Sequence, residues 1–161
     1  MKTIILVVVL TFAFATFGSF SADGPDYLTV DFKETKRLAL QGNQEAQFIL
    51  GDIYSHSGTG VPLDDEEAAK WYTKSAQQGY APAQFTLGLM YMFGVGVPKD
   101  RKQAAKWCTK SAQQGHASAQ RHLGSMYRDG VGVLQDHKQA IKWFTKSAQQ
   151  DNRASQYILG D

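Results

Sequence analysis

The sequence contains few residue combinations that could carry out chemistry. Its four histidines are His56, His116, His122 and His137. No two of them stand four residues apart on a predicted helix, and no carboxylate has the spacing of a metal ligand beside one. We therefore expect no metal site and no cofactor.

The single cysteine, Cys108, is the other candidate for chemistry. A lone cysteine excludes an intrachain disulfide and a CxxC-type zinc site. Cys108 occupies the position that Tyr72 and Phe144 take in related segments, so we expect a packing residue; a reactive thiol is the alternative, but no histidine neighbours it. A Ser-x-x-Lys nucleophile motif is absent from the sequence. We expect the protein not to be an enzyme.

Three glycine-rich segments could suggest a phosphate-binding loop. They read GTGV from Gly58, GVGV from Gly94 and GVGV from Gly130. A phosphate loop needs a preceding strand and the fuller GxGxxG spacing. These segments recur at a regular interval and follow helical patterns, so they are typical of turns that use the positive φ angles open to glycine.

Composition narrows the class of protein further. The chain has 161 residues, of which 43% are hydrophobic and 20% charged, as expected for a globular domain or a short repeat array. The net charge of +2 is too small to indicate nucleic-acid binding. We expect no nucleic-acid partner.

Residues 1–22 have the layout of a cleaved signal peptide. Lys2 precedes an apolar run from Ile4 to Phe17, and small residues follow it. A membrane anchor is the alternative, but the run is shorter than the roughly 20 residues that cross a bilayer. We expect a secreted or periplasmic protein with no integral membrane segment after cleavage.

The rest of the chain repeats itself. AQFILGDIY, AQFTLGLMY and AQRHLGSMY begin at Ala46, Ala83 and Ala119, and each is followed by a second conserved half such as AKWCTKSAQQG. This period predicts stacked helical hairpins that bury their apolar faces only against their neighbours. The divisions we expect are a signal peptide (1–22), a capping helix segment (23–45), three repeats (46–82, 83–118 and 119–154) and a truncated fourth start (155–161).

Each repeat splits into two helices joined by a glycine-rich turn. In the first helix Ala83, Leu87 and Tyr91 form a stripe at helical period, and the glycine at position 88 indicates close approach of a neighbouring helix. The second helix begins after an N-cap aspartate at 64, 100 or 136. Its buried stripe is expected to include the tryptophans at 71, 107 and 143, although an aromatic ligand site is the alternative.

This pattern resembles the Sel1-like repeat family of tetratricopeptide-like α-solenoids. The resemblance covers residues 46–154, and the matching positions in the second repeat are Leu87, Gly88, Tyr91, Gly94, Gly96, Val97, Asp100, Ala104, Trp107, Lys110, Ala112, Gln114 and Gly115. It implies an all-α solenoid of helix-turn-helix units that acts as a protein- or peptide-binding scaffold or adaptor. The alternative is a cell-wall or β-lactam binding or hydrolysing enzyme, since cysteine-rich relatives have such activities; they carry a disulfide in each unit, which this chain lacks.

Two surface patterns are candidates for binding a partner. Lysines recur every fourth residue at 102, 106 and 110 and at 138, 142 and 146; a solvated face and a docking strip for anions are both open. On the first helices, one stripe varies between repeats, and the resemblance places it on the concave surface. We call it the variable stripe; its residues are Phe48, Asp52, Phe85, Leu89, Met92, Arg121, Ser125 and Arg128.

The variable stripe has a simpler interpretation as well. Phe85 and Leu89 could extend the core between units instead of binding a partner. A protein or peptide is the partner expected at this stripe, and self-association is expected at the C-terminal end, where Tyr157 to Leu159 continue the apolar pattern.

Overall fold

The computed structural model of the chain describes residues 31–150, and within this range its regular secondary structure is entirely helical. The helices are α2 (Phe32–Leu40), α3 (Gln44–Ser55), α4 (Asp65–Gln77), α5 (Ala81–Phe93), α6 (Arg101–Gln113), α7 (Ala117–Asp129) and α8 (His137–Ala148). The predicted all-α solenoid is confirmed. The signal peptide expected at 1–22 and the fourth start expected at 155–161 lie outside the described residues.

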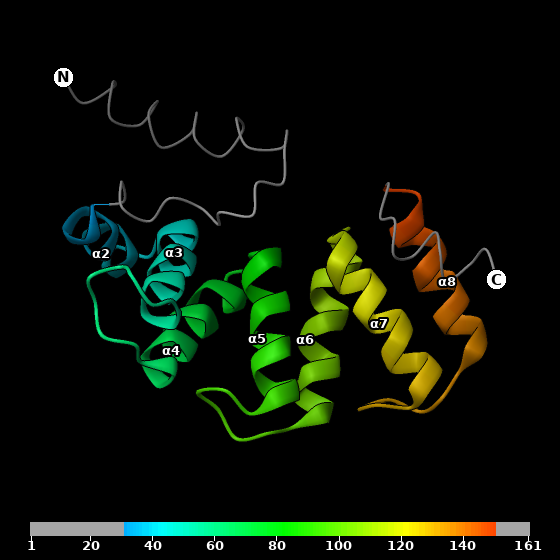
Figure 1. The fold of residues 1–161 in the computed structure, drawn as a ribbon. Helices are drawn as coiled ribbons and strands as arrows, with labels where there is room; N and C mark the ends of the chain where they lie inside the picture. Colours follow the sequence, from blue (N-terminus) through cyan, green and yellow to red (C-terminus); the bar gives the residue numbers. More distant parts are fainter. Residues whose placement is uncertain (1–30, 151–161) are drawn as a thin grey trace.

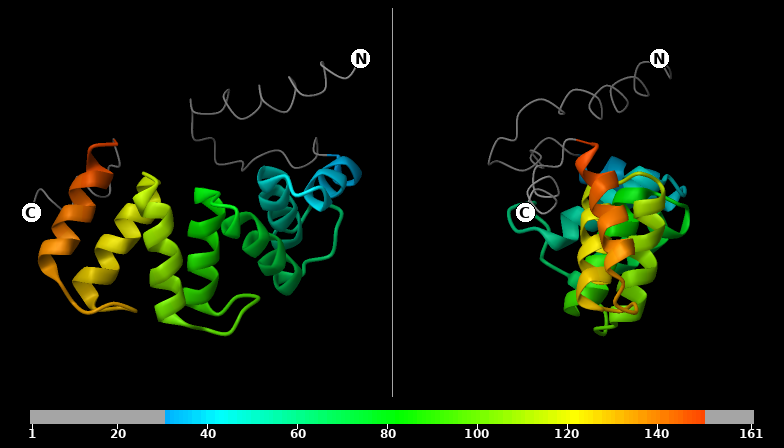
Figure 2. Two further views of the ribbon diagram at one scale, coloured as in Figure 1. Left: turned by 180° about the vertical axis from the view of Figure 1, so that it is seen from behind. Right: turned by 90° about the vertical axis from the view of Figure 1, so that its right-hand side faces the viewer.

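The helices form three pairs that stack in one row. α3 packs on α4, α5 on α6 and α7 on α8, and between units α4 packs on α5 and α6 on α7. Figure 1 shows the row running from α2 to α8, with the α5–α6 and α7–α8 turns along the same edge. Viewed along the row, the units lie one behind another (Figure 2). α2 packs on α3 and so takes the place of a preceding unit's second helix.

The second helices begin where the aspartates predict. The Asp64 side chain accepts the Glu67 N–H at 2.9 Å, and Asp100 and Asp136 cap α6 and α8 in the same way. Each cap satisfies a backbone donor that the first turn of a helix leaves without a partner. These bonds fix the point at which each turn ends and the second helix starts.

The predicted first-helix stripe is buried over only part of its length. Ala83 and Leu87 are inaccessible to solvent, but Tyr91 is half-buried and the preceding Met90 is buried instead. A residue seven positions after Ala83 returns to within about 20° of it around the helix, whereas the eighth has turned about 80° away. The same holds for Ile53 and Met126 in the other units.

The second-helix tryptophans do not all lie at the same depth. Trp71 and Trp143 are buried at 5% and 8% exposure, as predicted. Trp107 is half-buried and packs against the cluster of Ala76 and Leu87, so the expected buried stripe is only partly covered in this unit.

The glycine inside each first helix allows the paired helix to approach closely. A Cβ at Gly88 would lie 2.7 Å from the Cys108 sulfur, and one at Gly124 would lie 2.8 Å from the Phe144 ring. Both distances are shorter than any real Cβ contact, so only glycine fits. The close approach predicted from the sequence is confirmed.

The turns also hold neighbouring units together. Gly96 has a φ of +64°, and a Cβ on it would overlap the backbone carbonyl of Asp65 at the start of α4. Gly132 meets Arg101 at the start of α6 in the same way. The second glycine therefore packs against the preceding unit in the second and third turns, whereas a Cβ at Gly60 of the first turn would meet no other atom within 4 Å.

Candidate functional site

The first helices combine a fixed set of buried residues with the variable stripe. The alanine, glutamine, leucine and glycine of the repeated AQ-x-x-LG segment are buried in every unit. Residues that do not change between units therefore build the solenoid. The positions that change between units form the variable stripe, and in the structure they are half-buried or exposed.

Hydrogen bonds from fixed serines join the two helices of each unit. Ser111 is inaccessible to solvent, and its hydroxyl donates to the Ala81 carbonyl oxygen at 2.7 Å. Ser75 and Ser147 make the equivalent bonds to Gln44 and Ala117. These serines therefore fasten the end of each second helix to the start of the first helix of its unit.

Glutamines make a second set of bonds, and these cross from unit to unit. Gln114 Nε2 donates to Gln84 Oε1 at 2.7 Å, and Gln84 Nε2 donates to the Ala76 carbonyl oxygen of the preceding unit at 3.0 Å. We call each such set a glutamine chain. The others run from Gln78 through Gln47 to Ala39, and from Gln150 through Gln120 to Ala112. The first helices are thereby held in a defined position, which gives the variable stripe a rigid support.

Phe48 and Phe85 of the variable stripe lie at the junctions between units. The Phe48 ring is 5.4 Å from the Tyr80 ring, and the Phe85 ring is 5.1 Å from His116 and 5.0 Å from His122. Both phenylalanines are half-buried. They contribute to packing between units and also present part of each ring to solvent.

Asp52 does not project freely from the variable stripe. The Tyr72 hydroxyl donates to Asp52 Oδ1 at 2.6 Å and lies 3.0 Å from the Ser55 hydroxyl. Burial raises the pKa of the Asp52 carboxyl, and the bond from Tyr72 opposes this effect. Asp52 thus provides a partner for a tyrosine that the other units replace with cysteine or phenylalanine.

The remaining members of the variable stripe differ in accessibility. Leu89, Arg121 and Ser125 are half-buried, and Met92 packs against the core between α6 and α7. Arg128 is exposed and forms an ion pair with Asp129 at 2.8 Å. Among the large apolar side chains of the variable stripe, Leu89 is therefore the one that packs in neither an aromatic contact nor a core cluster.

Two histidines beside the variable stripe take part in its packing, which the sequence did not predict. His116 caps α7 by accepting the Ala119 N–H, and His122 Nδ1 lies 2.9 Å from the Ser118 carbonyl oxygen. Burial lowers the pKa of both imidazoles, and the neighbouring His122 lowers that of His116 further. Their spacing of six residues hides their common contact with Phe85, because one precedes α7 and the other lies within it.

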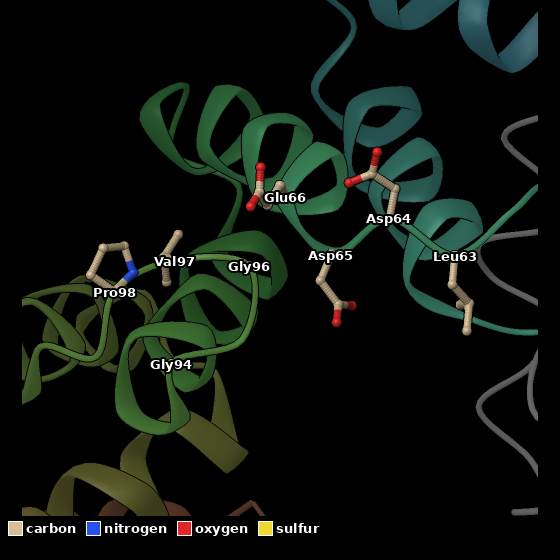
Figure 3. Close-up of a pocket in the computed structure, with 8 residues that line it drawn as sticks. All are labelled: Leu63, Asp64, Asp65, Glu66, Gly94, Gly96, Val97 and Pro98. Atoms are coloured by element: carbon tan, nitrogen blue, oxygen red, sulfur yellow. The ribbon is translucent and has the colours of Figure 1, made fainter.

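A shallow pocket lies elsewhere, between the start of α4 and the α5–α6 turn. It has a volume of about 560 Å³, and its lining includes Asp64, Asp65 and Glu66 (Figure 3). The carboxylates point in different directions in Figure 3, and Asp64 is used as the helix cap. Within residues 31–150 no group of histidine, cysteine and acidic side chains is arranged to hold a metal ion.

Cys108 has the environment of a packing residue. Its side chain is 1% exposed, and burial raises the pKa of the thiol to about 12. A nucleophilic cysteine needs a thiolate, which this environment disfavours. Among the described helices, none is long and apolar enough to cross a bilayer.

Comparison with known proteins identifies the repeat. A model of the Sel1 repeat matches residues 44–80, 81–116 and 117–152. The chain belongs to the Sel1 repeat family. The matched boundaries fall two residues before those of our alignment, at or next to the first residues of α3, α5 and α7.

Two solved structures with this fold share more than a third of their aligned residues with this chain. A protective antigen of uropathogenic Escherichia coli is 40% identical with a TM-score of 0.79, over 83% of this chain and 28% of the antigen. A Sel1 repeat protein from Oxalobacter formigenes is 37% identical with a TM-score of 0.76, over 81% of this chain and 98% of that protein.

A curated relative shares a shorter stretch of sequence. Chitin synthase regulatory factor 3 of Schizosaccharomyces pombe is 34% identical over 63 residues, which are 39% of this chain and 7% of the yeast protein. This Sel1 repeat protein therefore spans only a small part of the regulatory factor and about a quarter of the E. coli antigen.

Proposed function

We propose that this Sel1 repeat protein is an exported, non-catalytic scaffold that binds a protein or peptide along the variable stripe. The observation that carries the proposal is the difference in burial between repeated and varying positions on α3, α5 and α7. Positions that repeat are buried in the solenoid, while positions that vary keep part of their surface accessible.

The chemistry of the stripe suits an extended segment with an apolar centre. Phe85 and Leu89 of α5 offer half-buried apolar surface, and Arg121 of α7 adds a positive charge that is not in an ion pair with any side chain of residues 31–150, whereas Arg128 is paired with Asp129. Partly buried aromatic and aliphatic groups surrounded by polar ones are typical of the residues that dominate binding energy. We therefore favour a partner segment that carries a large apolar residue followed by an acidic one.

Photo-crosslinking from Leu89 tests this proposal. A photoreactive residue at position 89 should crosslink a partner protein in a native extract, and Phe85→Ala in the same chain should abolish the adduct. The control carries the photoreactive residue at Leu134, which is 90% exposed and lies in the turn between α7 and α8, outside the first helices.

The stability of each variant must be measured in parallel. Loss of crosslinking with unchanged urea unfolding supports a binding role for Phe85. Loss of stability together with loss of crosslinking assigns Phe85 to the core between units, and equal crosslinking from position 134 would defeat the proposal.

Export rests on residues 1–22 and has its own test. The mature protein should start between residues 19 and 23 and occur in the secreted or periplasmic fraction. N-terminal sequencing of the native protein decides this, and an intact Met1 on a membrane-embedded chain would contradict it.

A further inference from the structure

Positive charge is concentrated on the second helices of the second and third units. Together α6 and α8 carry seven basic side chains and no acidic one. The whole chain has 17 basic and 15 acidic residues, so the remainder of the chain is net acidic. α4 differs from α6 and α8 because it begins with Asp65, Glu66 and Glu67.

Six of these basic residues are exposed lysines in two parallel sets, which we call the lysine rows. Successive lysines in a row are about 6 Å apart along the helix axis. Corresponding lysines occupy equivalent positions of the repeat, so both rows face the same side of the solenoid. The helices that carry them, α6 and α8, are labelled in Figure 1. The rows are Lys102, Lys106 and Lys110 on α6 and Lys138, Lys142 and Lys146 on α8.

No acidic side chain of residues 31–150 forms an ion pair with the lysine rows. The ion pairs in that range are Arg37–Glu34, Lys70–Glu67 and Arg128–Asp129. Lys110 and Lys146 instead place their ammonium groups 4.4 and 4.9 Å from the centres of the Trp107 and Trp143 rings. Like charges four residues apart on a helix repel one another, and a bound anion would relieve that repulsion.

We propose that the lysine rows bind a linear, phosphate-bearing polyanion. Lysine is a compact point charge that suits phosphate groups, and regularly spaced charges along two helices match a chain of high charge density. Large exposed apolar side chains are absent from α6, and α8 exposes only Ile141. The surface therefore lacks both the apolar anchors of a protein interface and the broad apolar face of a helix that inserts into a membrane.

This surface is separate from the variable stripe. The lysine rows lie on the second helices, and the variable stripe lies on the first helices. The inference consequently goes beyond the proposed scaffold function and does not depend on it. A scaffold with both surfaces could hold a protein partner while it is attached to an anionic polymer.

The test is binding of the purified full chain to fluorescently labelled inorganic polyphosphate, followed by anisotropy over a range of salt concentrations. The principal variant is Lys106→Gln with Lys142→Gln, which neutralises the centre of each row. We expect the affinity at physiological salt to fall about thirtyfold. The slope of log K against log salt concentration should decrease in magnitude by about 1.4, because two phosphate contacts are lost.

The first unit provides the matched control. Lys70 is the equivalent of Lys106, but it is paired with Glu67 at 2.9 Å. Lys70→Gln with Lys74→Gln removes the same number of charges and should change the affinity less than twofold. Glu66→Lys places a lysine at the position equivalent to Lys102 and should increase the affinity about fivefold.

Each remaining outcome contradicts the proposal. Equal losses in the two double variants would mean that only the net charge matters. Binding that does not depend on salt would exclude a phosphate polyanion. Lysine-dependent binding to phosphatidylglycerol vesicles that polyphosphate cannot compete away would identify a lipid surface as the partner instead. Circular dichroism verifies that each variant is folded.

Discussion

A methyl group added at Gly88 should destabilise the protein, although alanine is the better helix former. The new Cβ of Gly88→Ala would lie 2.7 Å from the Cys108 sulfur and 3.3 Å from the Ala104 carbonyl oxygen and the Cys108 nitrogen. Cys108 is 1% exposed, so its side chain cannot move into solvent to make room. The helices α5 and α6 would have to separate.

The magnitude follows from two opposing effects. Replacing glycine by alanine inside a helix stabilises it by about 1 kcal/mol. Overpacking a tight core costs about 1–3 kcal/mol, and a contact this short belongs in the upper part of that range. We expect Gly88→Ala to lower the free energy of unfolding by about 1–2 kcal/mol.

A double-mutant cycle with Cys108→Ala identifies the cause. Removing the sulfur eliminates the shortest contact, so Gly88→Ala should cost nothing, or even stabilise, in that background. The expected coupling energy is about 1–3 kcal/mol, measured by urea unfolding followed by far-UV circular dichroism. Equal effects of Gly88→Ala in both backgrounds, or a gain in stability in the wild type, would refute the steric argument.

Three further predictions concern the same core and its junctions. Because folding lowers the pKa values of His116 and His122, the unfolded chain binds more protons, and the free energy of unfolding should fall as the pH drops below about 6.5. Urea unfolding at several pH values should show this dependence in the wild type and a weaker one in the variant with His116→Asn and His122→Asn. Cys108, whose pKa is raised to about 12, should resist alkylation in the native protein and react readily in urea, and rapid native labelling would contradict its burial. Gln84→Leu should lower the free energy of unfolding, measured in urea, by about 1–3 kcal/mol because it removes two hydrogen bonds, whereas a loss below 0.5 kcal/mol would show that the glutamine chain contributes little.

Most of the fold follows from the repeat in the sequence. The N-cap aspartates, the glycine turns and the alanine and leucine positions each have a local physical reason, and the structure has all of them in place. The depth of Trp107 and the bonds of Gln84 could not be predicted in this way. They depend on contacts between residues of different units, which helical periodicity does not describe.

The candidate site was only partly accessible to sequence reasoning. Periodicity correctly groups Phe85 and Leu89 on one face of α5, but it cannot show that the Phe85 ring contacts both His116, which caps α7, and His122 within α7. It also gives no sign that Asp52 is bound to Tyr72, since these residues lie on different helices. A varying position can therefore be free for a partner in one unit and fill a local gap in another.

The glutamine chains have a consequence for how such proteins change in length. Each unit brings one amide, such as Gln84, that bonds the carbonyl of the unit before it, and presents one carbonyl, such as Ala112, to the unit after it. Duplication or deletion of a complete unit in the gene therefore preserves every pair of partners across the new junction. A duplication whose length is not a whole number of units would separate an amide from its carbonyl inside the core. The lengths that can be added or lost without breaking these hydrogen bonds are therefore whole multiples of the repeat.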